Sequence, residues 1–459
     1  MMKKYLLLAV FLLGLGSAYV INAIRSNTFE PLAVSLDVNP STYKPIASVP
    51  VVIRGVTLLD GVGGQAQNVD ILLERGQIKL IGEGIDAPQS SMEIDGTGRY
   101  ITPGLIDVHT HLGTASLPYT TGDVSNWDVN EATNAMTPHV RAEHAISPQD
   151  PSLFAALAGG VTTFQVLPGS SNLVGGLGVV MKNVPAPTPQ AMKFPDAPYG
   201  LKMACGENPK SYGEQDKAPG SRMGNVALQR QAWIDAKTYD ADYRAGKRSR
   251  DLGLETLAAA LKGDVNIHIH CYRADDMATM IDMAHEFGFQ ITAFHHAVEA
   301  YKIPDLLREN DICSVVWSDW WGFKLEALDG IQENAAFLEA AKACVVIHSD
   351  LPVIGQMLVV ETAKALAAGR RAGLSLSTAE ALRWVTINPA KLLGIADKVG
   401  SLEVGKNADV VLWSGDPFSI YSRVDQVFID GAVVYDRHDP DHIPVSDMLT
   451  GQSALEGRL

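Results

Sequence analysis

The middle of the chain alternates apolar, strand-like runs with stretches of helical periodicity, and this alternation restricts the possible folds more than any other feature. Helical periodicity is clearest at 226–244 and 274–287. Repeated strand–helix units form parallel sheets, and eight such units can close into a (β/α)8 (TIM) barrel. The sequence therefore predicts an α/β fold built around such a barrel. The eight expected strands are 105–111, 161–167, 178–184, 200–206, 265–271, 290–296, 312–318 and 343–350.

Short strands separated by glycine and proline flank this central region on both sides. Three of them lie within residues 51–82, and the same pattern returns at 408–413 and 424–435. Short strands with tight turns are typical of a small β-sandwich. We therefore expect one β-sandwich domain built from both ends of the chain. The expected parts are the first part of the sandwich (51–104), the barrel (105–398), the second part of the sandwich (399–437) and a C-terminal tail (438–459).

The N-terminus has the composition of an export signal. Lys3 and Lys4 precede an uncharged apolar run, 5–21, and small residues follow. We interpret residues 1–23 as a signal peptide and 24–50 as a linker. An uncleaved N-terminal anchor is the alternative, because the apolar run is nearly long enough to span a bilayer. The mature protein is then expected in the periplasm or extracellular space, and at a membrane only if the segment stays attached.

Charge and cysteine content narrow the possible partners. The formal net charge of −15 disfavours nucleic acid and anionic membrane surfaces as partners. We expect a small-molecule substrate, with a homo-oligomer left open. Four cysteines, Cys205, Cys271, Cys313 and Cys344, are too few for a disulfide scaffold. Each lies in or beside a predicted buried strand, so we expect core thiols, with one disulfide possible in an oxidising compartment.

Histidine and aspartate collect where the predicted strands end. Three strands end in pairs at alternate positions, which share a face of the strand. A fourth ends in the neighbours His295 and His296, of which only one can easily point to the barrel axis. Buried, unpaired groups of this kind are costly, and a bound divalent metal removes that cost, with zinc the default for histidine ligands. The three alternating pairs are His109 and His111, His268 and His270, and His348 and Asp350.

Five motifs carry a resemblance to a known family. They are Pro103-Gly-Leu-Ile-Asp-Val-His-Thr-His, Ile269-His-Cys-Tyr-Arg-Ala-Asp-Asp, His296-Ala-Val-Glu-Ala-Tyr, His348-Ser-Asp-Leu-Pro-Val and Gly400-Ser-Leu-Glu-Val-Gly-Lys-Asn-Ala-Asp-Val-Val. Together they resemble the amidohydrolase superfamily of metal-dependent hydrolases, and the resemblance covers residues 51–436. The second motif is similar to that of imidazolonepropionase-like and prolidase-like members.

The resemblance implies ligand roles for the residues at the strand ends. His109, His111 and Asp350 would bind a first metal. His270 and His296 would bind a second metal, or complete the shell of a single one. Asp350 would also accept a proton from the attacking water, as a general base.

The ligand on the fourth strand is open between Lys202 and Glu207. The resemblance implies either a carboxylated lysine that bridges two metals or a glutamate from this strand. Small residues at alternate positions leave room for Lys202 to reach the barrel mouth, whereas Glu207 lies just past the strand. We expect Lys202 to be the bridge, with Glu207 as the alternative. His268 and His348 are expected one layer deeper, as hydrogen-bond partners of the ligands.

The resemblance implies hydrolysis of a C–N bond, in an amide, dipeptide or cyclic amide, by water that a metal activates. The alternatives are a deaminase or deacetylase with a mononuclear site and a non-catalytic metal-binding barrel. Specificity is expected to lie in the loops 113–150 and 207–250. The candidate substrate contacts are Tyr272, Arg273, Asn208, Tyr212 and Arg222.

Overall fold

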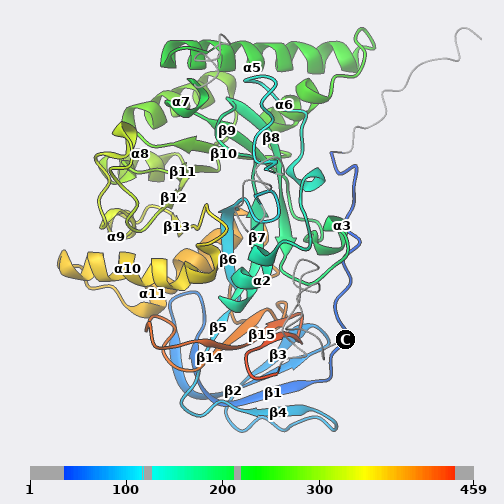
Figure 1. Ribbon diagram of the computed structural model, residues 1–459, viewed down its shortest axis with the longest axis vertical. Coiled ribbons are helices and arrows are strands. Elements are labelled where there is room, and N and C mark those ends of the chain that lie inside the picture. The colour runs from blue at the N-terminus through cyan, green and yellow to red at the C-terminus, as the bar shows by residue number, and fades with distance from the viewer. Residues whose placement is uncertain (1–35, 116, 118–126, 211–218, 440–459) are drawn as a thin grey trace, which may run out of the picture.

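A computed structural model describes residues 36–115, 117, 127–210 and 219–439 (Figure 1). Within them, one eight-stranded sheet has the order β13-β12-β11-β10-β9-β8-β7-β6. A parallel bridge between Thr110 and Asp350 joins its two edges, so the sheet forms a nearly closed barrel, as predicted. The barrel strands are β6 (Leu105–Thr110), β7 (Val161–Val166), β8 (Val174–Lys182), β9 (Gly200–Ala204), β10 (Asn266–Cys271), β11 (Ala293–His296), β12 (Cys313–Val316) and β13 (Val345–Ile347).

The third barrel strand differs from the parallel arrangement that the sequence predicted. Strand β8 runs antiparallel to both β7 and β9. Residues 167–173, which connect β7 to β8, contain no helix, and a short connection can only join antiparallel neighbours, because a parallel crossover needs a dozen residues or more. The barrel mouth is therefore formed by the carboxyl ends of the other strands together with the amino end of β8.

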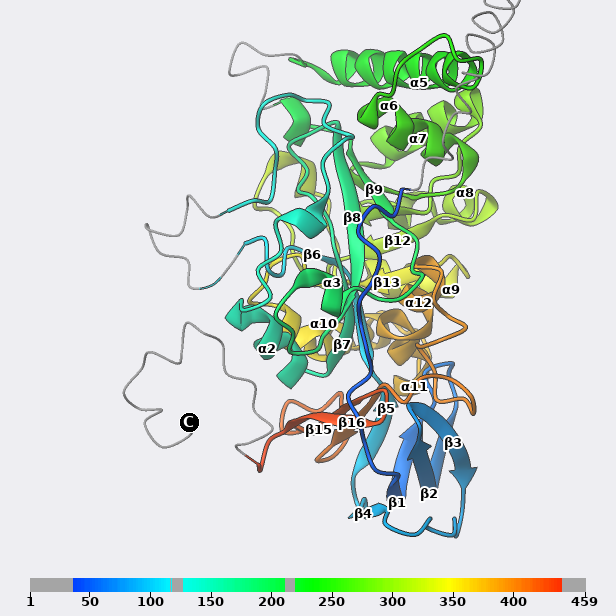
Figure 2. The same cartoon turned by 90° about the vertical axis from the view of Figure 1, so that its right-hand side faces the viewer.

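Helices cover the outside of the barrel (Figures 1 and 2). Their boundaries follow local chemistry: the Asp251 side chain accepts a hydrogen bond from the Leu254 amide at the start of α6, and Gly263, with φ +81°, ends it. The α-helices are α2 (Pro151–Ala158), α3 (Pro189–Met192), α5 (Arg222–Arg244), α6 (Leu252–Lys262), α7 (Ala274–Phe287), α8 (Pro304–Glu309), α9 (Asn334–Ala340), α10 (Leu358–Arg371), α11 (Thr378–Leu382) and α12 (Ile387–Leu392). The 3-10 helices are η2 (Ala142–His144), η3 (Asn208–Lys210), η4 (Ala300–Lys302), η5 (Leu325–Ala327), η6 (Gly355–Met357) and η7 (Arg383–Val385).

The second sheet is built from both ends of the chain, as predicted. Its order is β16-β15-β14-β5-β1-β2-β3, and β4 pairs with β1. Side chains from both ends, including Ile53, Ile71, Leu412 and Phe428, share one buried apolar cluster, so neither end could bury its apolar face alone. The strands are β1 (Val51–Leu59), β2 (Gln65–Glu74), β3 (Gln77–Gly82), β4 (Met92–Asp95), β5 (Tyr100–Pro103), β14 (Val410–Trp413), β15 (Val424–Ile429) and β16 (Ala432–Asp436).

The first part of the segment before β1 is bound to the rest of the fold. Residues 36–50 run from the barrel to the second sheet (Figure 2). The Lys193 ammonium, 2.6 Å from Asp37, and the Thr42 amide, 2.9 Å from the Gln190 carbonyl, hold the segment to the barrel. The first part of the described linker, 36–43, is therefore held by contacts with the rest of the fold, whereas residues 44–49 are exposed.

Both ends of the chain lie outside the described residues. They include the predicted signal peptide or anchor (1–23), the start of the linker and almost all of the predicted tail. Among the residues that the structure describes, no helix combines the length and hydropathy needed to cross a membrane.

A buried lysine joins the barrel, the second sheet and the N-terminal segment. The Lys182 ammonium on β8 lies 2.7 Å from a carboxylate oxygen of Asp430 and 3.3 Å from one of Asp409. The Tyr43 hydroxyl also donates to Asp430. The Lys182 side chain is only 1% exposed, so each charge in the cluster depends on the others for compensation.

We expect Lys182→Met to lower the free energy of unfolding by about 3–5 kcal/mol, because it leaves two buried carboxylates without their cation. Urea unfolding of the metal-free protein measures this change. Lys398→Met is the control: Lys398 is 32% exposed and 3.4 Å from Asp196, and such surface pairs contribute at most about 1 kcal/mol. Equal losses in the two variants would contradict the role of Lys182.

Candidate metal centre

The strand ends at the barrel mouth bring together two groups of potential metal ligands that share His109. One contains His109, His111 and Asp350, and the other contains His109, His296 and His348. Within each group the ligand atoms lie within 4.8 Å of one another. Imidazole nitrogens and a carboxylate at this spacing suit a divalent transition metal. Among the described residues, the structure thus contains two overlapping candidate sites.

The first group is held in place by the closure of the barrel. The Asp350 amide donates to the His109 carbonyl at 3.0 Å, and Asp350 adopts φ +64°. One carboxylate oxygen of Asp350 is 3.5 Å from Nε2 of both His109 and His111. His111 Nδ1 lies 2.9 Å from the Leu167 carbonyl and donates to it, which leaves Nε2 as the lone-pair nitrogen on the Asp350 side.

The expectation that only one of His295 and His296 faces the interior is wrong. Nδ1 of His295 lies 3.0 Å from Nδ1 of His109, and the ring centroid of His296 is 4.8 Å from that of His109. His296 adopts φ +69° and Ala297 φ +37°. This left-handed backbone breaks the alternation of the strand, so that both neighbouring rings reach His109. Backbone strain of this kind is concentrated at functional sites.

A hydrogen-bonded row of side chains supports His109 from below. Nε2 of His295 lies 2.8 Å from Nδ1 of His268, and Nε2 of His268 is 3.5 Å from the Gln165 amide nitrogen. His268 therefore lies one layer deeper, as the sequence predicted, but its partner is His295 and not one of the predicted ligands. His348 is placed differently, because it lies with His109 and His296 in the second group of ligands.

Several buried nitrogens at the mouth have no partner within the described residues. They are both ring nitrogens of His270 and of His348, and Nδ1 of His296. Burial strongly lowers the pKa of His270 and of His296, and it lowers the pKa of His348 to about 4. These rings are therefore neutral and present free lone pairs at neutral pH, which is the form that binds a metal. The donor set fits a divalent cation.

Lys202 reaches this cluster, whereas Glu207 does not. The Lys202 amine lies 3.0 Å from Nε2 of His109, and the residue is 1% exposed. Burial lowers the pKa of Lys202 to about 7, against the opposing effect of Asp350. The Glu207 carboxylate is 3.1 Å from the Lys324 ammonium and belongs to neither group of ligands.

The Asp350 carboxylate is ionised at neutral pH. Burial acts to raise the pKa of this carboxyl, but its electrostatic interactions with His111, His348 and Lys202 outweigh burial and lower the pKa. Deeper in the barrel, burial raises the pKa of Asp107 to about 7, and Asp107 accepts the amide of Ser349 at 3.3 Å. Asp107 thus orients the backbone that carries Asp350.

Of the predicted substrate contacts, the structure places one beside a proposed ligand and pairs three with other side chains. Tyr272 is buried beside His270, with ring centroids 4.6 Å apart. Arg273 pairs with Asp275 on the surface. Arg222 pairs with Asp276 and Glu326. Asn208 donates to Ser170 at 2.8 Å. Tyr212 lies outside the described residues.

Sequence reasoning missed Lys324, in the loop between β12 and α9. Its ammonium lies 4.2 Å from the ring centroid of Tyr272 and 2.5 Å from the Asn208 side-chain oxygen. The loop also places the Trp317 ring 4.2 Å from that of His296. Nothing in the local sequence around Lys324 indicates this position, because the residue reaches the mouth only through the course of a non-repetitive loop.

The four cysteines form two disulfides, Cys205–Cys271 and Cys313–Cys344. The expectation of core thiols is therefore wrong. His270 on β10 pairs with Ala204 on β9, and one residue further along this parallel register Cys271 lies beside Cys205. This disulfide ties the two strand ends next to His270. The second disulfide lies at the opposite end of the barrel, where β12 begins.

Replacing Cys205 and Cys271 together with alanine is expected to weaken metal binding by about 10-fold or more, because it loosens the support of His270. The matched control replaces Cys313 and Cys344 with alanine. Both variants should lose about 2–4 kcal/mol of stability, but only the first should lose metal affinity. Competition with a chromogenic chelator measures the affinity, and an equal loss in both variants would contradict the positioning role.

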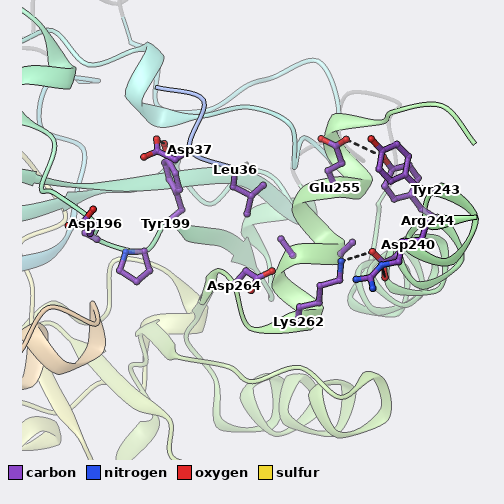
Figure 3. Close-up of a pocket in the computed structure, with 15 residues that line it drawn as sticks. Leu36, Asp37, Asp196, Tyr199, Asp240, Tyr243, Arg244, Glu255, Lys262 and Asp264 are labelled. Atoms are coloured by element: carbon purple, nitrogen blue, oxygen red, sulfur yellow. Dashed lines mark hydrogen bonds and ion pairs between the residues drawn. The ribbon is translucent and has the colours of Figure 1, made fainter. Parts of the chain in front are cut away.

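A cavity of about 640 Å³ lies apart from the ligands, between the end of α5, the end of α6 and the segment before β9 (Figure 3). Its lining includes Tyr239, Asp240, Glu255 and Lys262, and no member of the two ligand groups. Two pairs of lining side chains are in contact: Lys262 is 2.5 Å from Asp240, and the Tyr239 hydroxyl donates to Glu255 at 3.2 Å. This cavity is not the metal centre.

Comparisons with known proteins agree with the fold. The model of the amidohydrolase family matches residues 327–434. The crystal structure of an amidohydrolase from Thermotoga maritima is 36% identical, with a TM-score of 0.77, and the match covers 84% of this chain and all of that one. The chain therefore belongs to the amidohydrolase superfamily, which confirms the resemblance.

Two further matches are more limited. Amidohydrolase tasK from Hapsidospora irregularis is 33% identical over 408 residues, which are 82% of this chain but 41% of that protein. The chain thus spans less than half the length of this relative. A prolidase crystallised with N-methylphosphonate-L-proline is 16% identical, with a TM-score of 0.53, over 85% of this chain and 100% of that one. At that identity the likeness concerns the fold alone.

Proposed function

We propose that the protein is a metal-dependent hydrolase that cleaves a C–N bond in an amide, a dipeptide or a cyclic amide. The observation that carries this proposal is the convergence of Lys202, His109 and Asp350 at the barrel mouth, where a buried amine, an imidazole and an ionised carboxylate lie together. Superfamily membership supports the hydrolytic reaction class. The ligand set alone would also serve other hydrolyses.

In this proposal, His109, His111 and Asp350 would hold one divalent metal, and His270 and His296 would hold a second beside His348. Zinc is the natural choice for imidazole ligands. Lys202 would bridge the two ions after carboxylation. Its lowered pKa of about 7 supports this role, because the uncharged amine is the form that reacts with CO₂. The metal supplies a Lewis acid that activates water and polarises the scissile carbonyl.

Asp350 and Tyr272 would carry out the proton transfer and the hydrogen bonding of the reaction. Asp350 is ionised and can take a proton from the attacking water and return it to the leaving nitrogen. Burial raises the pKa of Tyr272, so its phenol stays protonated and can donate a hydrogen bond to the developing oxyanion. The Trp317 ring against His296 excludes water from that side of the site.

Export is part of the proposal. The two disulfides support it, because disulfides persist in oxidising compartments such as the periplasm and the extracellular space. The basic, then apolar N-terminus is consistent with the same destination. Fractionation of cells that express the full chain tests this part, since recovery of a reduced protein in the cytoplasm would contradict it.

The test of the proposed function is the metal content of protein purified without chelators and in bicarbonate, together with a screen of N-acyl amino acids, dipeptides and cyclic amides. We expect two metals per chain, and hydrolysis that a chelator abolishes and zinc restores. One metal per chain would contradict the bridged site and favour deaminase or deacetylase substrates. Failure to bind any divalent metal after reconstitution would contradict the enzymatic proposal.

A further inference from the structure

The barrel mouth next to the proposed ligands is lined by aromatic rings on one side. Tyr272 packs on His270, and Trp317 packs on His296. The ring of Phe323 completes this wall, 5.9 Å from Trp317 by ring centroids. A substrate whose amide reaches the ligands can therefore place its remaining groups against these rings, which favour an apolar body.

The ammonium group of Lys324 lies against this aromatic wall. Its ammonium is 4.2 Å from the ring centroid of Tyr272, and Tyr272 itself lies 4.6 Å from His270. The lysine is therefore separated from a proposed ligand by one aromatic ring. The Lys324 side chain is 22% exposed, so its ammonium is partly desolvated and still accessible to a ligand.

The two arginines among the predicted substrate contacts are already engaged. Arg222 pairs with Asp276 and with Glu326, whose side chains are 13% and 4% exposed. The Arg273 side chain is exposed at the surface, where two hydrogen bonds to Asp275, of 2.9 and 2.5 Å, hold it in a bidentate pair that is stronger than a single contact. Lys324, by contrast, is paired with Glu207, which is 33% exposed. Leaving an exposed ion pair costs little free energy, so an incoming carboxylate can displace Glu207 from Lys324.

We propose that Lys324 is the carboxylate-binding residue of the site and that the substrates are N-acyl amino acids or dipeptides with an apolar side chain. This inference rests on the proposed function and narrows its substrate class. In the free protein the Glu207 carboxylate forms an ion pair with the Lys324 ammonium. On binding, the free carboxylate of the substrate takes the place of Glu207, and Asn208, 2.5 Å from the ammonium, keeps the lysine in position.

The proposal makes Lys324 and Glu207 act in opposite directions. Lys324→Met removes the cation, so the preference for a carboxylate ligand should fall about tenfold or more, the effect of losing a charge-assisted hydrogen bond. Glu207→Gln removes the competing carboxylate, so the same preference should rise. A merely structural ion pair would behave differently, because either substitution would then affect all ligands in the same direction.

The experiment measures binding and needs no turnover. The probes are N-acetyl-L-phenylalanine and its carboxamide, titrated by calorimetry into the full zinc-loaded protein. We expect the wild type to prefer the carboxylate, Lys324→Met to lose this preference, and Glu207→Gln to increase it. The matched control is Lys302→Met, whose ammonium pairs with Asp329 at 2.7 Å and which should keep the wild-type preference.

Three results would overturn the proposal: equal affinity of the wild type for both probes, an unchanged preference in Lys324→Met, or no measurable binding of either probe at millimolar concentration. Lys324→Arg, which keeps the charge, should retain most of the preference and so separates loss of charge from misfolding. Failure of the proposed function is distinguishable, because it would leave both probes unhydrolysed while the binding preference remained.

Discussion

Replacing Asp350 with asparagine is expected to lower kcat by about 10²–10⁴-fold, the usual contribution of a general base. The amide oxygen can still contact a metal beside His109 and His111, but the amide cannot accept a proton at neutral pH. Metal content should therefore stay largely intact while turnover is lost. The measurement combines metal analysis with steady-state kinetics on the best substrate of the amide and dipeptide screen.

Asp319→Asn is the matched control for this experiment. Asp319 is another carboxylate at the barrel mouth, but it pairs with Lys364 at 2.9 Å and belongs to neither ligand group. Its replacement should change kcat by less than about threefold, since surface pairs contribute little. If Asp350→Asn keeps wild-type turnover, Asp350 is not the base; if the variant also loses all metal, Asp350 acts mainly as a ligand.

Lys202→Met is expected to reduce the metal content from two ions per chain to one and kcat by about a hundredfold or more, because methionine has a similar length but cannot carry a carboxylate. Metal analysis after reconstitution in bicarbonate and in CO₂-free buffer gives the clearest readout. The wild type should bind its full metal only with bicarbonate, and the variant should be indifferent to it.

The stability of the metal-free protein provides the check on Lys202→Met. Burial lowers the pKa of Lys202. Burying the lysine amine therefore costs free energy of folding, and a methionine side chain avoids this cost. The metal-free variant should therefore be at least as stable as the wild type. Lys210→Met, beyond the same strand, should leave both metal content and bicarbonate dependence unchanged. Two metals in Lys202→Met would exclude the bridge.

The alternation of strands predicted which side chains lie together at the strand ends, because side-chain direction along a regular strand is a local property. His109 and His111 share a face because they are two residues apart, and both lie beside Asp350 in the structure. The same reasoning failed for His295 and His296. The left-handed backbone of His296 is imposed by the surrounding structure, and periodicity contains no information about it.

Loops explain most of the other differences. Arg222, Arg273 and Glu207 were candidates by residue type, but each forms an ion pair that determines the position of its charged group. The partners are Asp276, Asp275 and Lys324, respectively. Such pairings depend on the path of non-repetitive segments across the mouth. Residue type alone therefore identified the chemistry available to the site without assigning it to positions.

The sequence by itself determined the barrel, the second sheet made from both ends of the chain and the strand positions of the histidines, because periodicity and motif spacing are local. Only the tertiary structure decided the reversed direction of β8, the pairing of the four cysteines and the placement of Lys324 over Tyr272. Each of these depends on contacts between segments far apart in the chain, and such contacts are established only when the strands close into the barrel.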